Sequence, residues 1–134
     1  HGPAPTLLIL DIDHFKKIND QHGHPSGDSV LAHLAQLLRA SLRNLDIVGR
    51  IGGEEFAVVL VETNAAMAEP VIDRLLERIR ETTVTLSDGQ PLQFTASIGS
   101  TEILWGDTID TAIQRADEAL YTAKNTGRNR HCQR

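Results

Sequence analysis

A glycine pair followed directly by two glutamates, at residues 52–55, joins two apolar segments of the sequence. The segments 47–51 and 56–61 have the composition of strands, so this short connection predicts a β-hairpin. We expect its turn to need the positive φ angles that glycine adopts without strain. A phosphate or nucleotide can approach a backbone that carries no side chain, and adjacent carboxylates attract a divalent cation or a proton. The alternative is a solvated hairpin tip that is acidic without being a site.

A second pair of carboxylates follows the first apolar run of the chain. The run 7–10 is wholly aliphatic, which predicts a central strand covered on both faces. Asp11, at the end of that strand, would have a rigid position from which to bind a ligand. Asp13 stands where a helix N-cap is expected, and we predict that it caps the helix that follows. Asp11 is therefore the better ligand candidate.

Strand-like and helix-like segments alternate along the chain. We expect a strand at 7–11, a short helix opening at 15, helices at 26–42, 64–80 and 108–126, a strand pair around 87–90 and a strand at 93–100. Gly127 is placed to end the last helix. Antiparallel hairpins interleaved with helices predict an α+β fold, in which helices flank a central, mostly antiparallel sheet.

Length and composition restrict the classes of function. The chain has 134 residues, 40% of them hydrophobic, which fits one globular domain. No apolar run approaches the roughly 18 residues of a membrane span, so we expect no membrane contact and a cytoplasmic location. A net charge of −5 argues against nucleic acid as a partner. With a single cysteine and irregularly spaced histidines at 14, 22 and 24, we expect neither a disulfide nor a zinc site.

Three blocks of the sequence resemble, in order and spacing, the GGDEF family of diguanylate cyclases. They are DIDHFKKINDQHGHPSGD at 11–28, RIGGEEF at 50–56 and ADEALYTAKNTGRN at 116–129. We expect the domain to cover 7–130, with an expression remnant and lead-in at 1–6 and a tail at 131–134. The resemblance implies a palm-like nucleotidyl-cyclase fold. It also implies the condensation of two GTP molecules into cyclic di-GMP with release of pyrophosphate.

The acidic residues acquire roles from this resemblance. In the family's reaction, the 3′-hydroxyl of one GTP attacks the α-phosphate of the other, assisted by two divalent ions held by carboxylates. The resemblance assigns Asp11, Glu54 and Glu55 as these acids, with the backbone carbonyl of Ile12 as a further ligand. Hard oxygen ligands favour Mg²⁺, with Mn²⁺ as the alternative. Glu54 could also accept the hydroxyl proton, and the sequence does not separate these two roles.

Two further pairs of residues match the family's nucleotide contacts. Asn19 and Asp28 match the positions that bind guanine, whose N1–H and exocyclic amine can donate to a carboxylate. Without the resemblance, Asp28 is simply a favourable acid in the first turn of a helix. Lys124 and Arg128 match the positions that reach the β- and γ-phosphates. By composition alone they would be a solvated basic turn that complements the helix dipole.

The residues that open the short helix after the first strand are a third candidate contact. Phe15 and Lys16 lie where free backbone N–H groups could hold a phosphate. The side chain of Phe15 itself we expect in the core.

Arg43 and Asp46 form an Arg-x-x-Asp motif shortly before the hairpin turn. Its register relative to Gly52 resembles that of the family's inhibitory site for cyclic di-GMP, and Arg74 matches the second arginine of that site. Guanidinium groups suit both phosphate and guanine. The resemblance therefore implies product inhibition. The alternative is a weak surface ion pair, since so short a motif arises often by chance.

The sequence also departs from the family. Members usually begin with a helix bearing Asp-x-Leu-Thr-Gly-Leu-x-Asn-Arg, which has no counterpart here, so the resemblance implies a truncated domain with weak activity by itself. Because each active site holds one GTP, turnover implies a homodimer, normally brought together by a sensory or receiver domain. Two functions stay open: a diguanylate cyclase, and a module that binds cyclic di-GMP or GTP without turnover. The intact Glu54 and Glu55 favour the enzyme, and a dimerisation scaffold ranks last.

Overall fold

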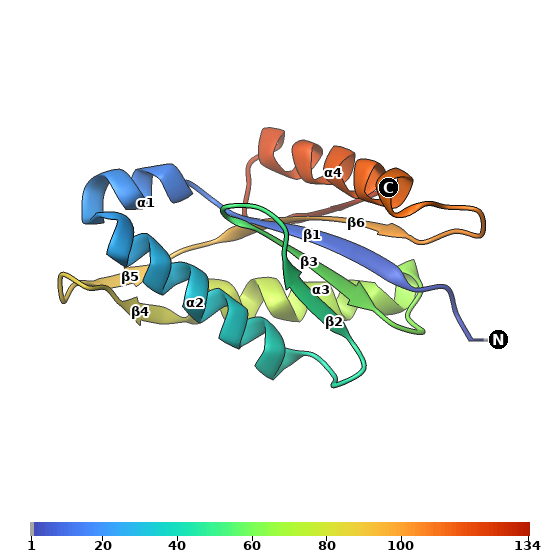
Figure 1. Cartoon of the computed structure of the whole chain (residues 1–134), viewed down its shortest axis with the longest axis horizontal. Coiled ribbons are helices and arrows are strands. Elements are labelled where there is room, and N and C mark those ends of the chain that lie inside the picture. The colour runs from blue at the N-terminus through green and yellow to red at the C-terminus, as the bar shows by residue number, and fades with distance from the viewer. Residues whose placement is uncertain (1) are drawn as a thin grey trace.

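A five-stranded sheet forms the centre of the molecule, and helices cover both of its faces (Figure 1). The computed structural model describes residues 2–134. In chain order the elements are β1 (Thr6–Ile12), α1 (Phe15–His22), α2 (His24–Ser41), β2 (Ile47–Arg50), β3 (Glu55–Leu60), α3 (Ala65–Glu81), β4 (Thr83–Thr85), β5 (Pro91–Gln93), β6 (Ala96–Glu102), α4 (Ile109–Asn125) and β7 (His131–Gln133). The strand order is β2-β3-β1-β6-β7. Within the described residues of this sheet, the β6–β7 pair alone is parallel.

Strand β1 lies in the middle of this sheet, and all of its residues are buried. Its alternate side chains enter two cores, as the period of a strand requires. Leu8 and Leu10 belong to the larger core with α2 and α3, whereas Leu7 and Ile9 pack against α4. Figure 1 shows α4 on one face of the sheet and α2 and α3 on the other. The predicted α+β fold with a central covered strand is confirmed.

The helices agree with the predicted ranges to within two residues, but two strand expectations differ from the structure. The strand expected at 93–100 is interrupted, because Pro91–Gln93 pairs with β4 in a separate hairpin and β6 begins only at Ala96. The residues expected as a tail form β7, which pairs with the otherwise free edge of β6. Gly127, with a φ of 136°, ends α4 and turns the chain back toward that edge. None of the helices within residues 2–134 combines the length and apolar character needed to cross a membrane.

The contact between α4 and β6 depends on Gly99 in the middle of β6. A Cβ atom at this position would lie 2.2 Å from both the carbonyl oxygen of Ala116 and the backbone nitrogen of Leu120. These are backbone atoms of a packed helix, which cannot move aside as a flexible side chain would. The absence of a side chain at Gly99 therefore sets how closely α4 approaches the sheet.

We predict that Gly99→Ala lowers the free energy of unfolding by about 1–3 kcal/mol, the usual cost of overpacking. Gly49→Ala in β2 is the matched control, because within residues 2–134 no atom lies within 4 Å of a Cβ at Gly49. Urea denaturation of the two variants provides the measurement. If both variants were equally stable, α4 would not be seated on Gly99 as described.

Candidate functional site

Asp11 brings the end of β1 together with the end of α4. In the sheet register Asp11 lies opposite Glu55 on β3, and its side chain points to the same face as Leu7 and Ile9. There Asp11 Oδ2 accepts a hydrogen bond from Lys124 Nζ of α4, which also makes an ion pair with it. Asp11 is only 3% exposed, and no group within residues 2–134 donates to its other oxygen, Oδ1.

The charge balance at this end of the sheet is unfavourable for carboxylates. Burial raises the pKa of Glu54, and repulsion by Asp11 raises it further. Burial likewise raises the pKa of Glu55, with added repulsion from Asp117 of α4 and from Asp11. Lys124 opposes both shifts through its positive charge. Four acids thus share one lysine, and a bound cation would relieve the repulsion between them.

The residues present fit a divalent cation that brings oxygen ligands with it. In the described part of the chain, no three His, Cys, Asp or Glu side chains converge closely enough to hold a metal alone. However, the free, buried Oδ1 of Asp11 lacks a partner, which is costly for a carboxylate oxygen unless a ligand supplies one. Mg²⁺ is commonly bound by one or two carboxylates, with waters and substrate phosphates completing its shell. Asp11 and Glu54 can supply such a pair.

The glycines of the hairpin turn differ from expectation in their conformation. Neither Gly52 nor Gly53 adopts a positive φ, so the prediction that the turn requires one is wrong. Arg50 holds the turn instead, because its guanidinium donates to the carbonyl oxygens of Gly52 (3.2 Å) and Gly53 (2.6 and 3.1 Å). A Cβ at Gly53 would meet no atom within 4 Å among residues 2–134. The glycines therefore keep the turn free of side chains, and its backbone conformation does not require them. No signal in the sequence indicated that Arg50 stabilises the turn.

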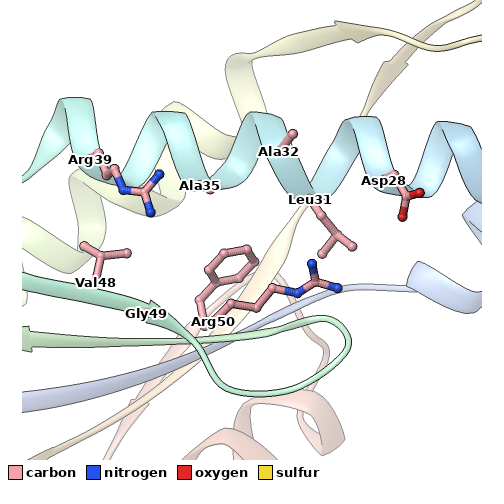
Figure 2. A pocket seen from close by; sticks show the side chains of 9 residues that line it. Asp28, Leu31, Ala32, Ala35, Arg39, Val48, Gly49 and Arg50 are labelled. Atoms are coloured by element: carbon pink, nitrogen blue, oxygen red, sulfur yellow. The ribbon is translucent and has the colours of Figure 1, made fainter.

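Asn19 and Asp28 lie at the corner between α1 and α2. Asn19 packs directly against α2, since a Cβ at Gly27 would lie 1.8 Å from Asn19 Oδ1. That oxygen is buried and has no hydrogen-bond donor in the described range 2–134. The first turn of α2 contains no acid, because the helix begins at His24 and places Asp28 in its second turn. Asp28 is exposed and lines a groove of about 290 Å³ with Leu31 and Arg50 (Figure 2). The corner thus offers two oxygen acceptors beside an open groove.

The two predicted phosphate contacts lie at and beyond the end of α4. Lys124 is in the last turn of the helix and contacts Asp11, whereas Arg128 follows the helix, is exposed and has a φ of 60°. The N–H of Arg128 donates to the carbonyl of Ala123 (2.9 Å), which completes the predicted glycine-dependent helix stop. Because the chain leaves the helix at Gly127, Lys124 and Arg128 do not share a helical face.

Phe15 and Lys16 separate in the structure. The side chain of Phe15 is 9% exposed and belongs to the larger core, as expected for its ring. Lys16 is exposed on α1. Ile12, the proposed carbonyl ligand, has a buried side chain at the last position of β1.

Asp13 does not cap α1, so this prediction is wrong. The N-cap of α1 is His14, which has a left-handed φ of 57° and makes no side-chain cap. The buried carboxylate of Asp13 accepts instead from Thr95 Oγ1 (2.6 Å), Ser97 Oγ (2.6 Å) and the backbone N–H of Asn129 (2.9 Å). The backbone N–H of Asp13 also donates to the carbonyl of Thr95 (2.9 Å), which keeps Asp13 beside the start of β6 rather than at the helix terminus.

Arg43 and Asp46 make a closely bonded pair beside Val61, at the opposite end of β3 from Glu55. Two guanidinium nitrogens of Arg43 donate to the carboxylate of Asp46 (2.9 and 3.2 Å), and Arg43 also donates to the carbonyl of Val61 (2.7 Å). Partial burial favours the neutral form of Asp46, but hydrogen bonds from Arg43 and Val61 outweigh it and lower the pKa of Asp46. Arg43, Asp46 and Arg74 line one cavity of about 230 Å³.

The chain belongs to the family described as "Diguanylate cyclase, GGDEF domain", whose model matches residues 2–130. It is 40% identical over 126 residues to diguanylate cyclase A of Treponema denticola, covering 93% of this chain and 34% of that protein. The chain thus spans about a third of the length of this relative.

Solved structures agree with this membership. The active GGEEF domain of a diguanylate cyclase from Vibrio cholerae is 36% identical with a TM-score of 0.87, over 98% of this chain and 83% of that one. The GGDEF domain of DgcB from Caulobacter crescentus, solved in complex with c-di-GMP, is 30% identical with a TM-score of 0.91. The match covers 97% of this chain and 77% of that one. The fold implied by the sequence resemblance is therefore confirmed.

We predict that Lys124→Met raises the pKa of both Glu54 and Glu55, because it removes the one positive charge that lowers them. A carboxyl-carbon NMR titration without divalent ions measures both groups. The matched control is Lys17→Met, an exposed lysine of α1 that contributes to neither shift. Unchanged pKa values in Lys124→Met would mean that the lysine does not balance the acidic cluster.

Proposed function

We propose that this chain is a diguanylate cyclase domain that condenses two GTP molecules into cyclic di-GMP with release of two pyrophosphates. The observation that carries the proposal is the buried Oδ1 of Asp11, left without a donor beside Glu54 and Lys124. A groove between α2 and the β2–β3 hairpin is lined by Asp28, an acceptor suited to guanine. Nucleotide condensation requires both a cation site and a site for the base.

Each proposed residue has a separate part in this reaction. Asp11, Glu54 and Glu55, with the Ile12 carbonyl, would hold Mg²⁺ or Mn²⁺. The chemistry supplied by a bound pair of such ions is a lower pKa for the attacking 3′-hydroxyl and neutralisation of the triphosphate. Glu54 would also accept the hydroxyl proton.

The remaining contacts hold the nucleotide in place. Asn19 and Asp28 would accept from the guanine edge. Lys124 and Arg128 would bind the outer phosphates, with the backbone N–H groups at Phe15 and Lys16 as further donors. Lys124 contacts Asp11 in the structure and would bind a phosphate in the complex. It would leave Asp11 for the phosphate when a cation binds the Asp11 carboxylate.

Turnover would require two copies of the domain. The chain carries one set of guanine acceptors and one set of phosphate contacts, whereas the product contains two guanosine monophosphates. The second GTP must therefore be presented by a second copy facing the first. A sensory or receiver segment of a longer protein would raise the effective concentration of the two domains.

Glu55→Gln is predicted to reduce cyclic di-GMP synthesis by about a hundredfold or more, since it removes charge at the point where the reaction develops it. The variant should fold normally, because the pKa of Glu55 is raised and its ionised form is disfavoured by the fold. Chromatographic detection of product from GTP and Mg²⁺ provides the rate, and circular dichroism the fold. Glu69→Gln, at an exposed position of α3, is the control. A near-normal rate in Glu55→Gln would remove Glu55 from the account.

Product inhibition would act through Arg43, Asp46 and Arg74. Arg43, from the segment after α2, and Arg74, from α3, bring two guanidinium groups to one cavity. Guanidinium groups suit a phosphodiester or a guanine edge. The DgcB domain shares this fold and was solved in complex with c-di-GMP. The site lies apart from Asp11, so occupancy there would regulate the domain rather than block its substrate directly.

We predict that Arg43→Ala raises the cyclic di-GMP concentration for half-inhibition by about tenfold or more, the usual value of a charge-assisted contact. Arg74→Ala should have the same direction of effect while leaving the Arg43–Asp46 pair intact. Initial rates measured over a series of added product give the inhibition curves. Arg78→Ala, an α3 arginine bonded to Ser41, is the control. Unchanged curves in both Arg43→Ala and Arg74→Ala would exclude this site.

A further inference from the structure

We propose that Asp13 is a positioning residue, which holds the Gly127–Arg130 loop against the end of β1 so that Arg128 faces the nucleotide. The inference rests on the proposed function, because it assumes that Arg128 binds phosphate. The family resemblance assigns no role to Asp13, and its place before a helix predicts a cap. Its contacts in the structure instead join three segments that are distant in sequence.

Asp13 is 5% exposed, and both of its carboxylate oxygens accept hydrogen bonds. Oδ1 accepts from Ser97 Oγ of β6 (2.6 Å), and Oδ2 accepts from Thr95 Oγ1 (2.6 Å) and from the N–H of Asn129 (2.9 Å). The backbone N–H of Asp13 also donates to the carbonyl of Thr95 (2.9 Å). The carboxylate of Asp13 is thus bonded both to β6 and the residue before it and to Asn129.

The loop that Asp13 holds has an uncommon backbone. Arg128 and Asn129 have φ angles of 60° and 48°, so two consecutive non-glycine residues are left-handed. Such a conformation persists only where surrounding contacts determine it. The loop is held at its end by Ile98 N–H, which donates to the carbonyl of Arg130 (3.0 Å), and from α3 by Arg80 Nε, which donates to Asn129 Oδ1 (3.2 Å).

The hydrogen bond between Asp13 and Asn129 lies close in sequence to two proposed binding groups, Asp11 and Arg128. Asp13 lies two residues after Asp11, and Asn129 directly follows Arg128. A hydrogen bond between Asp13 and Asn129 therefore fixes the distance between the carboxylate end of β1 and the arginine beyond α4. Binding of a triphosphate across that distance is favoured when both ends are already in place.

A double-mutant cycle on nucleotide affinity tests the proposal. Titration calorimetry with GTP and Ca²⁺ measures binding to wild type, Asp13→Ala, Arg128→Ala and the double variant. We expect Asp13→Ala and Arg128→Ala each to weaken binding by about tenfold, and the double variant to be no weaker than Arg128→Ala. Thr6→Ala, which removes another buried side-chain hydrogen bond of β1 far from the loop, should not change affinity. Losses that multiply in the double variant would overturn the proposal.

Two further variants separate positioning from general stability. Asp13→Asn should restore affinity to within a few-fold of wild type, because its amide oxygen can face Asn129 N–H while its NH₂ donates to Ser97 Oγ. Arg80→Ala removes an exposed contact and is expected to fold even if Asp13→Ala does not. It should weaken binding by about twofold to threefold in wild type and not in Arg128→Ala. Arg78→Ala is its control, and equal effects of Arg80→Ala in both backgrounds would contradict the proposal.

Hydrogen exchange at the Asn129 amide tests the anchor without any nucleotide. Exchange should be slow in wild type and Asp13→Asn, and at least about tenfold faster in Asp13→Ala. If wild type bound no GTP, the proposed function would fail while this measurement still decided the positioning role. Rapid exchange of the Asn129 amide in the wild-type protein would refute that role.

Discussion

A strand that is buried on both faces and ends in a carboxylate is the constraint on which the rest of this structure depends. Every residue of β1 is buried, so Asp11 leaves the apolar core with one oxygen bonded to Lys124 and the other without a donor among residues 2–134. This arrangement requires α4 to lie close to the sheet, which Gly99 permits. The packing that stabilises the fold therefore also creates an incomplete charge site, which a cation could complete.

The same strand connects the site to its surroundings. Its register with β3 brings Glu55 beside Asp11, and its continuation to Asp13 reaches β6 and the loop after α4. Glu55, Lys124 and the loop that carries Arg128 are thus each paired or bonded to this strand or to its continuation. In the proposed reaction, groups held in this way would need little rearrangement when substrate binds, which favours electrostatic stabilisation of a transition state.

Local patterns in the sequence predicted the features of the fold that are decided by residues close together in the chain. The aliphatic run before Asp11 indicated a central strand, and Gly127 indicated the end of α4, because each signal acts within a few positions. Asp13 was misinterpreted because its hydrogen-bond partners Thr95, Ser97 and Asn129 lie 82, 84 and 116 residues away.

The remaining differences have the same origin. Gly52 and Gly53 were expected to adopt positive φ angles, but the carbonyls of their turn are satisfied by Arg50 in an ordinary conformation. Residues 131–133 have no strong strand pattern, and they form β7 only because the edge of β6 is available to them. Neither outcome follows from local propensity, since each is decided by a tertiary contact.

The most direct test of the central claim is to incubate the purified chain with GTP and Mg²⁺ over a range of protein concentrations and to quantify cyclic di-GMP and pyrophosphate by chromatography. The account predicts both products in a ratio of one to two, at a rate that rises faster than linearly with protein concentration. Tight binding of cyclic di-GMP without any product at the highest protein concentration would contradict it, and would identify the chain as a receptor.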